Sequence, residues 1–88
     1  MIEDRKQIYE EAIAQFGIEN QVIVCIEELS ELQKELTKFL RGNAKTSSLA
    51  DEVADVIITV EQMILYFDLE NEVKDYMDAK LKRLEERL

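Results

Sequence analysis

Residues 19–41 read ENQVIVCIEELSELQKELTKFLR, and apolar side chains recur along this stretch at alternating steps of four and three residues. That spacing places them on one side of an α-helix, because the helix turns once every 3.6 residues. The apolar series starts one residue earlier and consists of Ile18, Val22, Cys25, Leu29, Leu32, Leu36 and Phe39. We therefore predict a helix of about 23 residues whose apolar side packs against other helices.

Three further helices are predicted around this one. The chain has no proline, and Gly17 and Gly42 each follow an apolar-periodic run, where a left-handed residue commonly ends a helix. The other helices are expected over residues 5–16, 49–67 and 69–88. The caps expected at their starts are Asp4, Ser47 or Ser48, and Asp68. The predicted fold class is all-α: one domain, residues 1–88, that forms a four-helix bundle.

The apolar positions of these helices predict which sides are buried. The inner side of the first helix is expected to be Ile8, Tyr9, Ala12, Ile13 and Phe16. Most of the third helix is apolar, through Val53, Val56, Ile57, Val60, Met63, Ile64 and Phe67. What remains on the third helix is a polar ridge of Ser48, Glu52, Asp55, Thr59 and Gln62. Since apolar residues flank this ridge on both sides, it cannot simply face water.

Charge and composition argue against several classes of protein. The 88 residues carry a formal net charge of −9, which disfavours direct binding of nucleic acid because phosphate binding needs a basic surface. The single cysteine, Cys25, cannot form an internal disulfide, which suits a reducing cytoplasm. No signal peptide and no apolar stretch long enough to span a bilayer is apparent. We expect a soluble, cytoplasmic protein without a membrane partner.

The helix lengths predict self-association. The second helix would be roughly 34 Å long at the usual helical rise, about twice the length of the first. A single core is only marginally stabilising at this chain length, and the remaining helices cannot cover both sides of the second and third. We expect a homodimer or homotetramer in which helices of two chains complete the bundle.

Two pairs of acidic residues have the spacing that puts both side chains on one side of a helix. Glu28 and Glu31 belong to the second helix, and Glu52 and Asp55 to the third. If these helices pack face to face, four carboxylates meet, and a hard cation such as Mg²⁺ is the simplest way to offset their repulsion. The chain has no histidine, so it lacks the Glu-x-x-His ligands of a ferritin-like di-iron bundle.

Each acid taken singly also has a structural explanation. Acids in the first turn of a helix interact well with its dipole, which would account for Glu52, although Asp51 already serves there. Glu28 could lie on a solvated side, but the residues four positions away, Val24 and Leu32, are apolar. Two matched pairs on the two central helices favour metal binding over surface charge.

The last helix carries a stripe of basic residues that includes Lys80 and Arg83. Both side chains have the donors that bind phosphate oxygens. Cations near the C-terminal end of a helix also offset its dipole, so both interpretations stay open.

These acids resemble those of the MazG-like, all-α nucleoside triphosphate pyrophosphohydrolases. The family pattern Glu-Glu-x-x-Glu followed by Glu-x-x-Asp is matched by Glu27, Glu28, Glu31, Glu52 and Asp55, and the resemblance covers nearly the whole chain. It implies cleavage of an NTP or dNTP between the α and β phosphates, with Mg²⁺ or with Mn²⁺ in its place. The implied metal ligands are Glu28, Glu31, Glu52 and Asp55. Glu27, which would orient water or a ligand, joins Glu28 and Glu31 as an implied catalytic residue.

Two alternatives stay open beside this resemblance. One is an enzyme of the same fold that resembles phosphoribosyl-ATP pyrophosphohydrolase, which has similar acids. The other is a non-catalytic helical interaction module whose carboxylates bind a basic partner. Pyrophosphate release from a panel of nucleotides in the presence of magnesium distinguishes these three interpretations.

Overall fold

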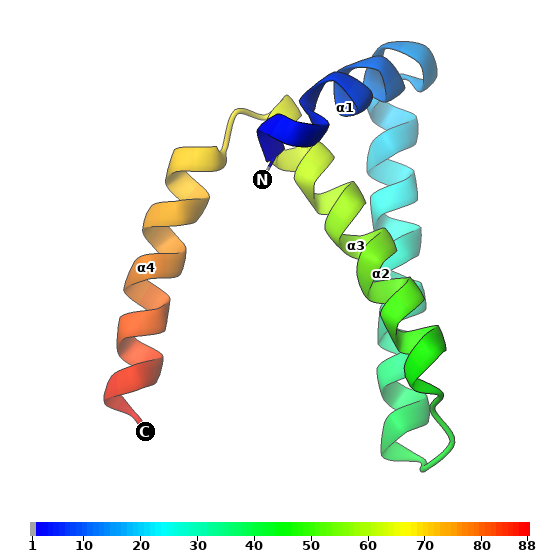
Figure 1. Cartoon of the computed structure of the whole chain (residues 1–88), viewed down its shortest axis with the longest axis vertical. Coiled ribbons are helices and arrows are strands. Elements are labelled where there is room, and N and C mark those ends of the chain that lie inside the picture. The colour runs from blue at the N-terminus through cyan, green and yellow to red at the C-terminus, as the bar shows by residue number, and fades with distance from the viewer. Residues whose placement is uncertain (1) are drawn as a thin grey trace.

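The computed structural model describes residues 2–88, and the regular secondary structure among them consists of four α-helices. The helices are α1 (Ile2–Phe16), α2 (Ile18–Leu40), α3 (Thr46–Tyr66) and α4 (Glu70–Glu86). In Figure 1, α2 and α3 run antiparallel side by side, α1 lies across their upper end, and α4 diverges from α3. The expected all-α fold with four helices is thus confirmed. None of the four helices is both long and apolar enough to cross a membrane.

Both glycines follow the end of a helix, as predicted. Gly17 and Gly42 have φ angles of 86° and 81°, in a region that residues with a side chain rarely adopt. After α2, the amide of Gly42 donates to the Phe39 carbonyl (3.0 Å) and the amide of Asn43 donates to the Lys38 carbonyl (3.1 Å). These bonds satisfy carbonyl groups at the end of α2 and turn the chain toward α3.

The side-chain caps expected for α1 and α3 are wrong. Asp4 lies inside α1, and Ser47 and Ser48 lie inside the first turn of α3. Lys45 precedes α3 instead, and its carbonyl accepts a hydrogen bond from the amide of Leu49 (3.1 Å). Among the described residues no side chain caps α3, so its first turn is held by backbone bonds alone.

The turn between α3 and α4 also differs from the prediction. Asp68 was expected to cap α4, but its φ angle of 54° is left-handed, a conformation that aspartate tolerates and that an N-cap does not use. The next amide, of Leu69, donates to the carbonyl of Ile64 (2.9 Å) and closes the end of α3. Asp68 therefore ends one helix rather than starting the next.

The polar ridge of α3 faces α2. Thr59 and Gln62 are buried in this contact, and Gln21 of α2 is buried opposite them. The side-chain amide of Gln21 donates to the Oε1 atom of Gln62 (2.7 Å). Thr59 donates its hydroxyl proton to the carbonyl of Asp55 in its own helix (3.0 Å). The prediction that this ridge does not face water is confirmed.

Much of the predicted apolar surface lies beside this contact rather than in it. Of the apolar series on α2, Cys25 is buried, whereas Leu36 is 49% exposed. The exposed members of the apolar sets on α2 and α3 are Leu29, Leu36, Phe39, Val53, Ile57 and Phe67. One chain therefore leaves these residues uncovered, because α3 presents its polar ridge to α2. Their coverage by a second chain stays a prediction from the sequence.

Tyr9 connects α1 to α3 and is only 2% exposed. Its hydroxyl donates to Oε1 of Glu61, and the Arg5 guanidinium donates to the same carboxylate through Nε (2.9 Å) and Nη2 (2.7 Å). Ile8 and Phe16 were expected on the inner side of α1, but they are 66% and 53% exposed. Because α1 crosses the end of the other helices, only a narrow strip of it is covered (Figure 1).

We expect Glu61→Gln to remove an acid-sensitive part of the stability. The hydrogen bond from Arg5 lowers the pKa of Glu61 below its usual 4.5; burial opposes this shift and the Tyr9 hydroxyl supports it. A lowered pKa stabilises the folded chain above pH 4.5, and this stabilisation is lost as the pH falls through the lowered value. The difference in Tm between the parent and Glu61→Gln should therefore be largest near neutral pH and shrink below pH 4.5.

Thermal melts followed by circular dichroism across this pH range would measure the effect. Glu10→Gln is the matched control, because Glu10 is an exposed acid on α1. Its Tm should follow that of the parent at every pH. A Tm difference for Glu61→Gln that stays constant with pH would contradict the assignment.

Candidate metal centre

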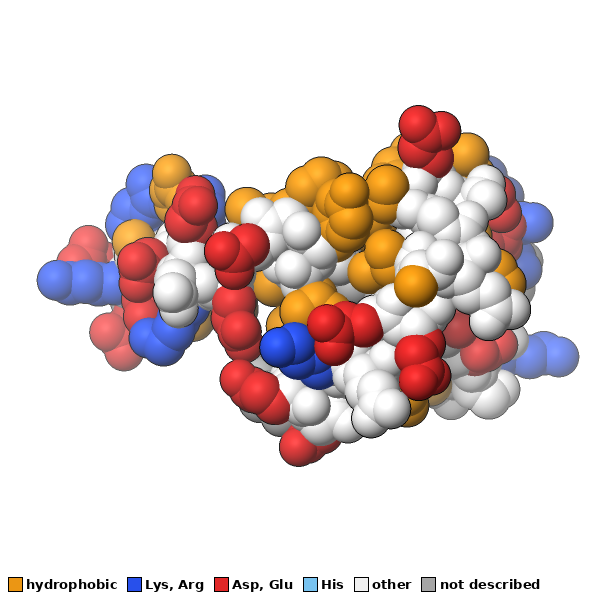
Figure 2. Space-filling model, turned by 90° about the horizontal axis from the view of Figure 1, so that it is seen from above, with side chains coloured by type: hydrophobic (Ala, Val, Ile, Leu, Met, Phe, Trp, Pro, Cys, Tyr) orange, Lys and Arg blue, Asp and Glu red, His pale blue; other side chains and the backbone are white. Residues whose placement is uncertain are grey.

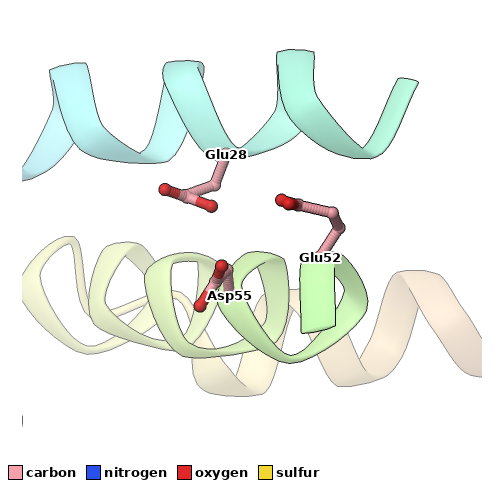
Figure 3. Close-up of side chains that lie close together, drawn as sticks. All are labelled: Glu28, Glu52 and Asp55. Atoms are coloured by element: carbon pink, nitrogen blue, oxygen red, sulfur yellow. The ribbon is translucent and has the colours of Figure 1, made fainter. Parts of the chain in front are cut away.

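Three carboxyl groups meet between α2 and α3. Glu28 reaches from α2, and Glu52 and Asp55 reach toward it from α3 (Figure 3). One oxygen atom of each lies within 4.8 Å of the other two, and all three side chains are half-buried. We refer to Glu28, Glu52 and Asp55 as the acidic cluster. It unites three of the four metal ligands that the sequence predicts.

The register of the two antiparallel helices explains why these residues meet. The bonded amides of Gln21 and Gln62 set this register. Glu28 lies seven residues after Gln21 in α2, and Asp55 lies seven residues before Gln62 in α3. Because seven residues make nearly two helical turns, both steps return to the same side of the helix. Glu52 lies three residues before Asp55 and so shares that side.

Burial and crowded negative charge both oppose ionisation of the acidic cluster. Burial is the main cause that raises the pKa of Glu28, and the charge of the adjacent Asp55 raises it further. Burial is also the main cause that raises the pKa of Glu52, and the charges of Asp51 and Asp55 raise it further. Ionising these two glutamates therefore costs more free energy than ionising an ordinary surface acid, and a bound cation would offset that cost.

One oxygen atom of the acidic cluster has no hydrogen-bond donor. The Oε2 atom of Glu52 is buried and accepts no hydrogen bond from the described residues. A buried polar atom without a partner is costly, which favours a ligand at this position. Lys38 on α2 does not supply one, since it donates to Glu35 (3.1 Å).

The donor set of the acidic cluster fits a small cation that prefers oxygen. Carboxylate oxygens are the usual protein ligands of Mg²⁺ and suit Mn²⁺ as well. Opposite ligands of Mg²⁺ lie about 4.2 Å apart, so separations of up to 4.8 Å require only a small contraction of the side chains. The residues present are thus compatible with the cation that the sequence suggests.

The other two acids of the sequence motif lie outside the acidic cluster. Glu31 is exposed on α2, but its charge contributes to the raised pKa values of Glu28 and Glu52. Glu27 is exposed and lines a shallow hollow with Phe16 and other residues near the start of α2. Glu31 is therefore close enough to act on the cluster electrostatically, whereas Glu27 faces another side of α2.

Lys80 and Arg83 are not brought to the acidic cluster within one chain. Both are exposed on α4, and in the described chain α4 contacts α3 but not α2 (Figure 1). Neither side chain makes a hydrogen bond or ion pair with the described residues. Their predicted contact with phosphate stays a prediction from the sequence.

Glu35 is a neighbour of the acidic cluster that the sequence motif does not include. Its side chain is 12% exposed, and its charge contributes to the raised pKa of Glu52. The signal was available in the sequence, because Glu35 follows Glu28 by seven residues and so lies on the same side of α2. Its ion pair with Lys38 (3.1 Å) sets it apart from the three clustered acids.

The fold and the acidic cluster together define an all-α protein with a candidate cation site between two antiparallel helices. Comparisons of the chain with protein-family models, with curated proteins and with solved structures give no match. The resemblance to MazG-like enzymes therefore rests on the residues of the sequence alone, and function has to be argued from the site.

Proposed function

We propose that this protein is a Mg²⁺-dependent nucleoside triphosphate pyrophosphohydrolase, which cleaves an NTP or dNTP to the monophosphate and pyrophosphate. The observation that carries the proposal is the acidic cluster, in which Glu28 lies opposite Glu52 and Asp55 across two helices. The buried, unpartnered oxygen of Glu52 adds to it, because that atom lacks a donor within the described chain. The order of these acids along the sequence supports the MazG-like reading over other metal-dependent chemistries.

The residues of the site have separate tasks in this proposal. Glu28, Glu52 and Asp55 would hold the cation, with Glu31 as the fourth ligand that the sequence motif implies. When bound, Mg²⁺ would neutralise charge on the triphosphate and promote attack by water. The chain has no histidine, so in this proposal a carboxylate would accept the proton from that water. A catalytic role for Glu27 rests on the resemblance.

We further propose that the active form is a homodimer or homotetramer. The support is the apolar surface of α2 and α3 that the single chain leaves uncovered, including Leu29, Leu36, Val53 and Ile57. Side chains of this kind are costly to expose together, and pairing with the same surface of a second copy would cover them.

A nucleotide panel tests the activity. Each NTP and dNTP, and phosphoribosyl-ATP, would be incubated with the protein and Mg²⁺, and the products separated by chromatography. Formation of monophosphate and pyrophosphate from an NTP or dNTP is the expected result. Cleavage of phosphoribosyl-ATP alone would favour the alternative enzyme of the same fold. No cleavage of any nucleotide would leave the acidic interaction module, with a basic partner, as the better explanation.

We expect millimolar Mg²⁺ to raise the Tm of the parent chain and EDTA to reverse the gain. A ligand that binds only the folded state stabilises it by about 2.7 kcal/mol at a hundredfold excess over its Kd. Glu52→Gln should raise the Tm in EDTA, because it removes one charge from a crowded site, and Mg²⁺ should then add less. Differential scanning fluorimetry with and without metal measures both effects.

Glu10→Gln serves as the control for the metal titration, since this exposed acid lies on α1, outside the acidic cluster. It should respond to Mg²⁺ as the parent does. A parent Tm that does not change at millimolar Mg²⁺ or Mn²⁺ would count against a cation at the acidic cluster.

A further inference from the structure

α4 lacks a packing partner along most of its length. None of its residues is buried, and of the other helices in the described chain it contacts only α3. Between α3 and α4 lies a groove of about 390 Å³. The apolar residues that line it are Ile2, Ile64, Val73, Met77 and Leu81. In Figure 2, which views the molecule from above, hydrophobic side chains gather near the middle of the molecule, to the right of α4.

The chain also exposes more surface than a compact protein of its size. Its accessible surface is 7118 Å², whereas a compact monomer of 10.3 kDa exposes about 5,400 Å². Its radius of gyration is 15.3 Å, against about 12 Å for a compact domain of 88 residues. The excess of about 1,700 Å² is roughly twice what each partner buries in a standard protein interface. A stable contact with a second copy would account for it.

The charges of α4 are opposite at its two ends. Residues 70–78 contain four acids and one base, whereas residues 79–87 contain four bases and two acids. Two copies of α4 that run antiparallel therefore place opposite charges side by side at both ends. With a twofold axis near Ala79, Arg87 of one copy comes beside Glu70 of the other, and Glu85 comes beside Lys74. Glu70 and Lys74 both line the groove.

The same alignment also matches the apolar residues of α4. The apolar stripe runs through Val73, Met77, Leu81 and Leu84, of which the last three are about half exposed. Around an axis near Ala79, Met77 lies opposite Leu81 of the second copy, and Val73 lies next to Leu84. Charge and apolar pattern thus agree on one antiparallel register, which is what a self-complementary twofold interface requires.

We propose that α4 pairs antiparallel with α4 of a second copy, each filling the groove between α3 and α4 of the other. Twofold symmetry allows both grooves to be filled at once, with the two α4 helices in the middle and one α3 on each side. The occupant is a second copy rather than an unrelated protein. The acidic first half of α4 lies beside the basic second half of an antiparallel α4, so the helix is complementary in charge to a second copy of itself. This contact does not depend on the proposed enzymatic activity.

Two charge-reversed variants test the contact by analytical ultracentrifugation at micromolar concentration. The first carries Lys74→Glu with Arg87→Glu, and the second carries Glu70→Lys with Glu85→Lys. Each variant places like charges side by side when it pairs with itself, so its mass should be half that of the parent. In an equal mixture of the two variants, opposite charges face each other again at every contact. The mixture should therefore recover the parent mass.

A third variant controls for the change in charge. Asp75→Lys with Glu86→Lys alters the same number of acids as the second variant, on the side of α4 away from the groove, and should keep the parent mass. Circular dichroism on all variants verifies that a lower mass does not reflect unfolding. A parent that sediments at 10.3 kDa would overturn the proposal. So would variants that keep the parent mass, or a mixture that fails to recover it.

Discussion

Glu28→Gln and Asp55→Asn are each expected to reduce pyrophosphate release by more than about 100-fold while the protein stays folded. Changing a residue that only orients a metal ligand commonly costs about 10- to 100-fold, so removal of a ligand charge should cost more. Folding should survive, because each substitution keeps the shape of the side chain and relieves repulsion among half-buried carboxylates. Initial rates at saturating nucleotide and at a fixed Mg²⁺ concentration that saturates only the parent, with Tm measured alongside, test both parts.

Glu10→Gln is the matched control for these variants. It removes the same charge from an exposed position on α1, outside the acidic cluster, and should keep parent activity. Raising the Mg²⁺ concentration should partly restore activity in the variants of the cluster, since their loss comes from weaker metal binding. Parent-like rates in Glu28→Gln or Asp55→Asn would refute the ligand assignment while leaving the fold untouched.

The largest effect on stability is expected from Tyr9→Ala. Removing a buried aromatic side chain typically costs about 3–5 kcal/mol through lost burial and the cavity that remains. Tyr9 is 2% exposed and also donates its hydroxyl hydrogen bond to Glu61. A domain of this size has a total stability of only about 5–13 kcal/mol, so this loss would remove a large share of it and weaken the packing of α1 on α3. Urea unfolding at one fixed protein concentration measures the change.

Two further variants separate the causes of this loss. Tyr9→Phe keeps the ring and loses only the hydroxyl, which should cost about 1.5–3 kcal/mol because its partner is charged. Ile8→Ala changes the neighbouring position, which is 66% exposed, and should stay within about 0.5 kcal/mol of the parent. An equal cost for Tyr9→Ala and Ile8→Ala would show that α1 does not pack on α3 in this way.

The sequence by itself determined where the helices lie. Apolar spacing and the glycines at positions 17 and 42 predicted four helices, and the observed helices begin within three residues of the predicted starts. These are local properties, because a 3.6-residue period and a positive φ angle depend on a few neighbouring residues. The caps were predicted less well. Aspartate and serine side chains can bond to the backbone in several local conformations, so these residue types do not by themselves define a cap. This applies to Asp4, Ser47, Ser48 and Asp68.

The sequence also placed Glu28, Glu52 and Asp55 on the sides of their helices that could meet. The sequence could not decide how far each helix is rotated about its own axis, and therefore which of its sides faces the neighbouring helix. The side of α2 toward α3 runs through Gln21, Cys25, Glu28, Leu32 and Glu35, which are buried or half-buried. Glu31 shares a side with Glu28 on an isolated helix, yet it lies off this line and stays exposed.

Only the tertiary structure decided which polar and apolar residues are covered. The bond between Gln21 and Gln62 joins the polar ridge of α3 to α2, and this orientation leaves Leu29 and Leu36 half exposed beside the contact. A spacing pattern reports which residues share a side of one helix, whereas the partner of that side depends on residues distant in the chain. Helix positions were therefore determined locally, and the acidic cluster and the uncovered apolar surface arose from packing.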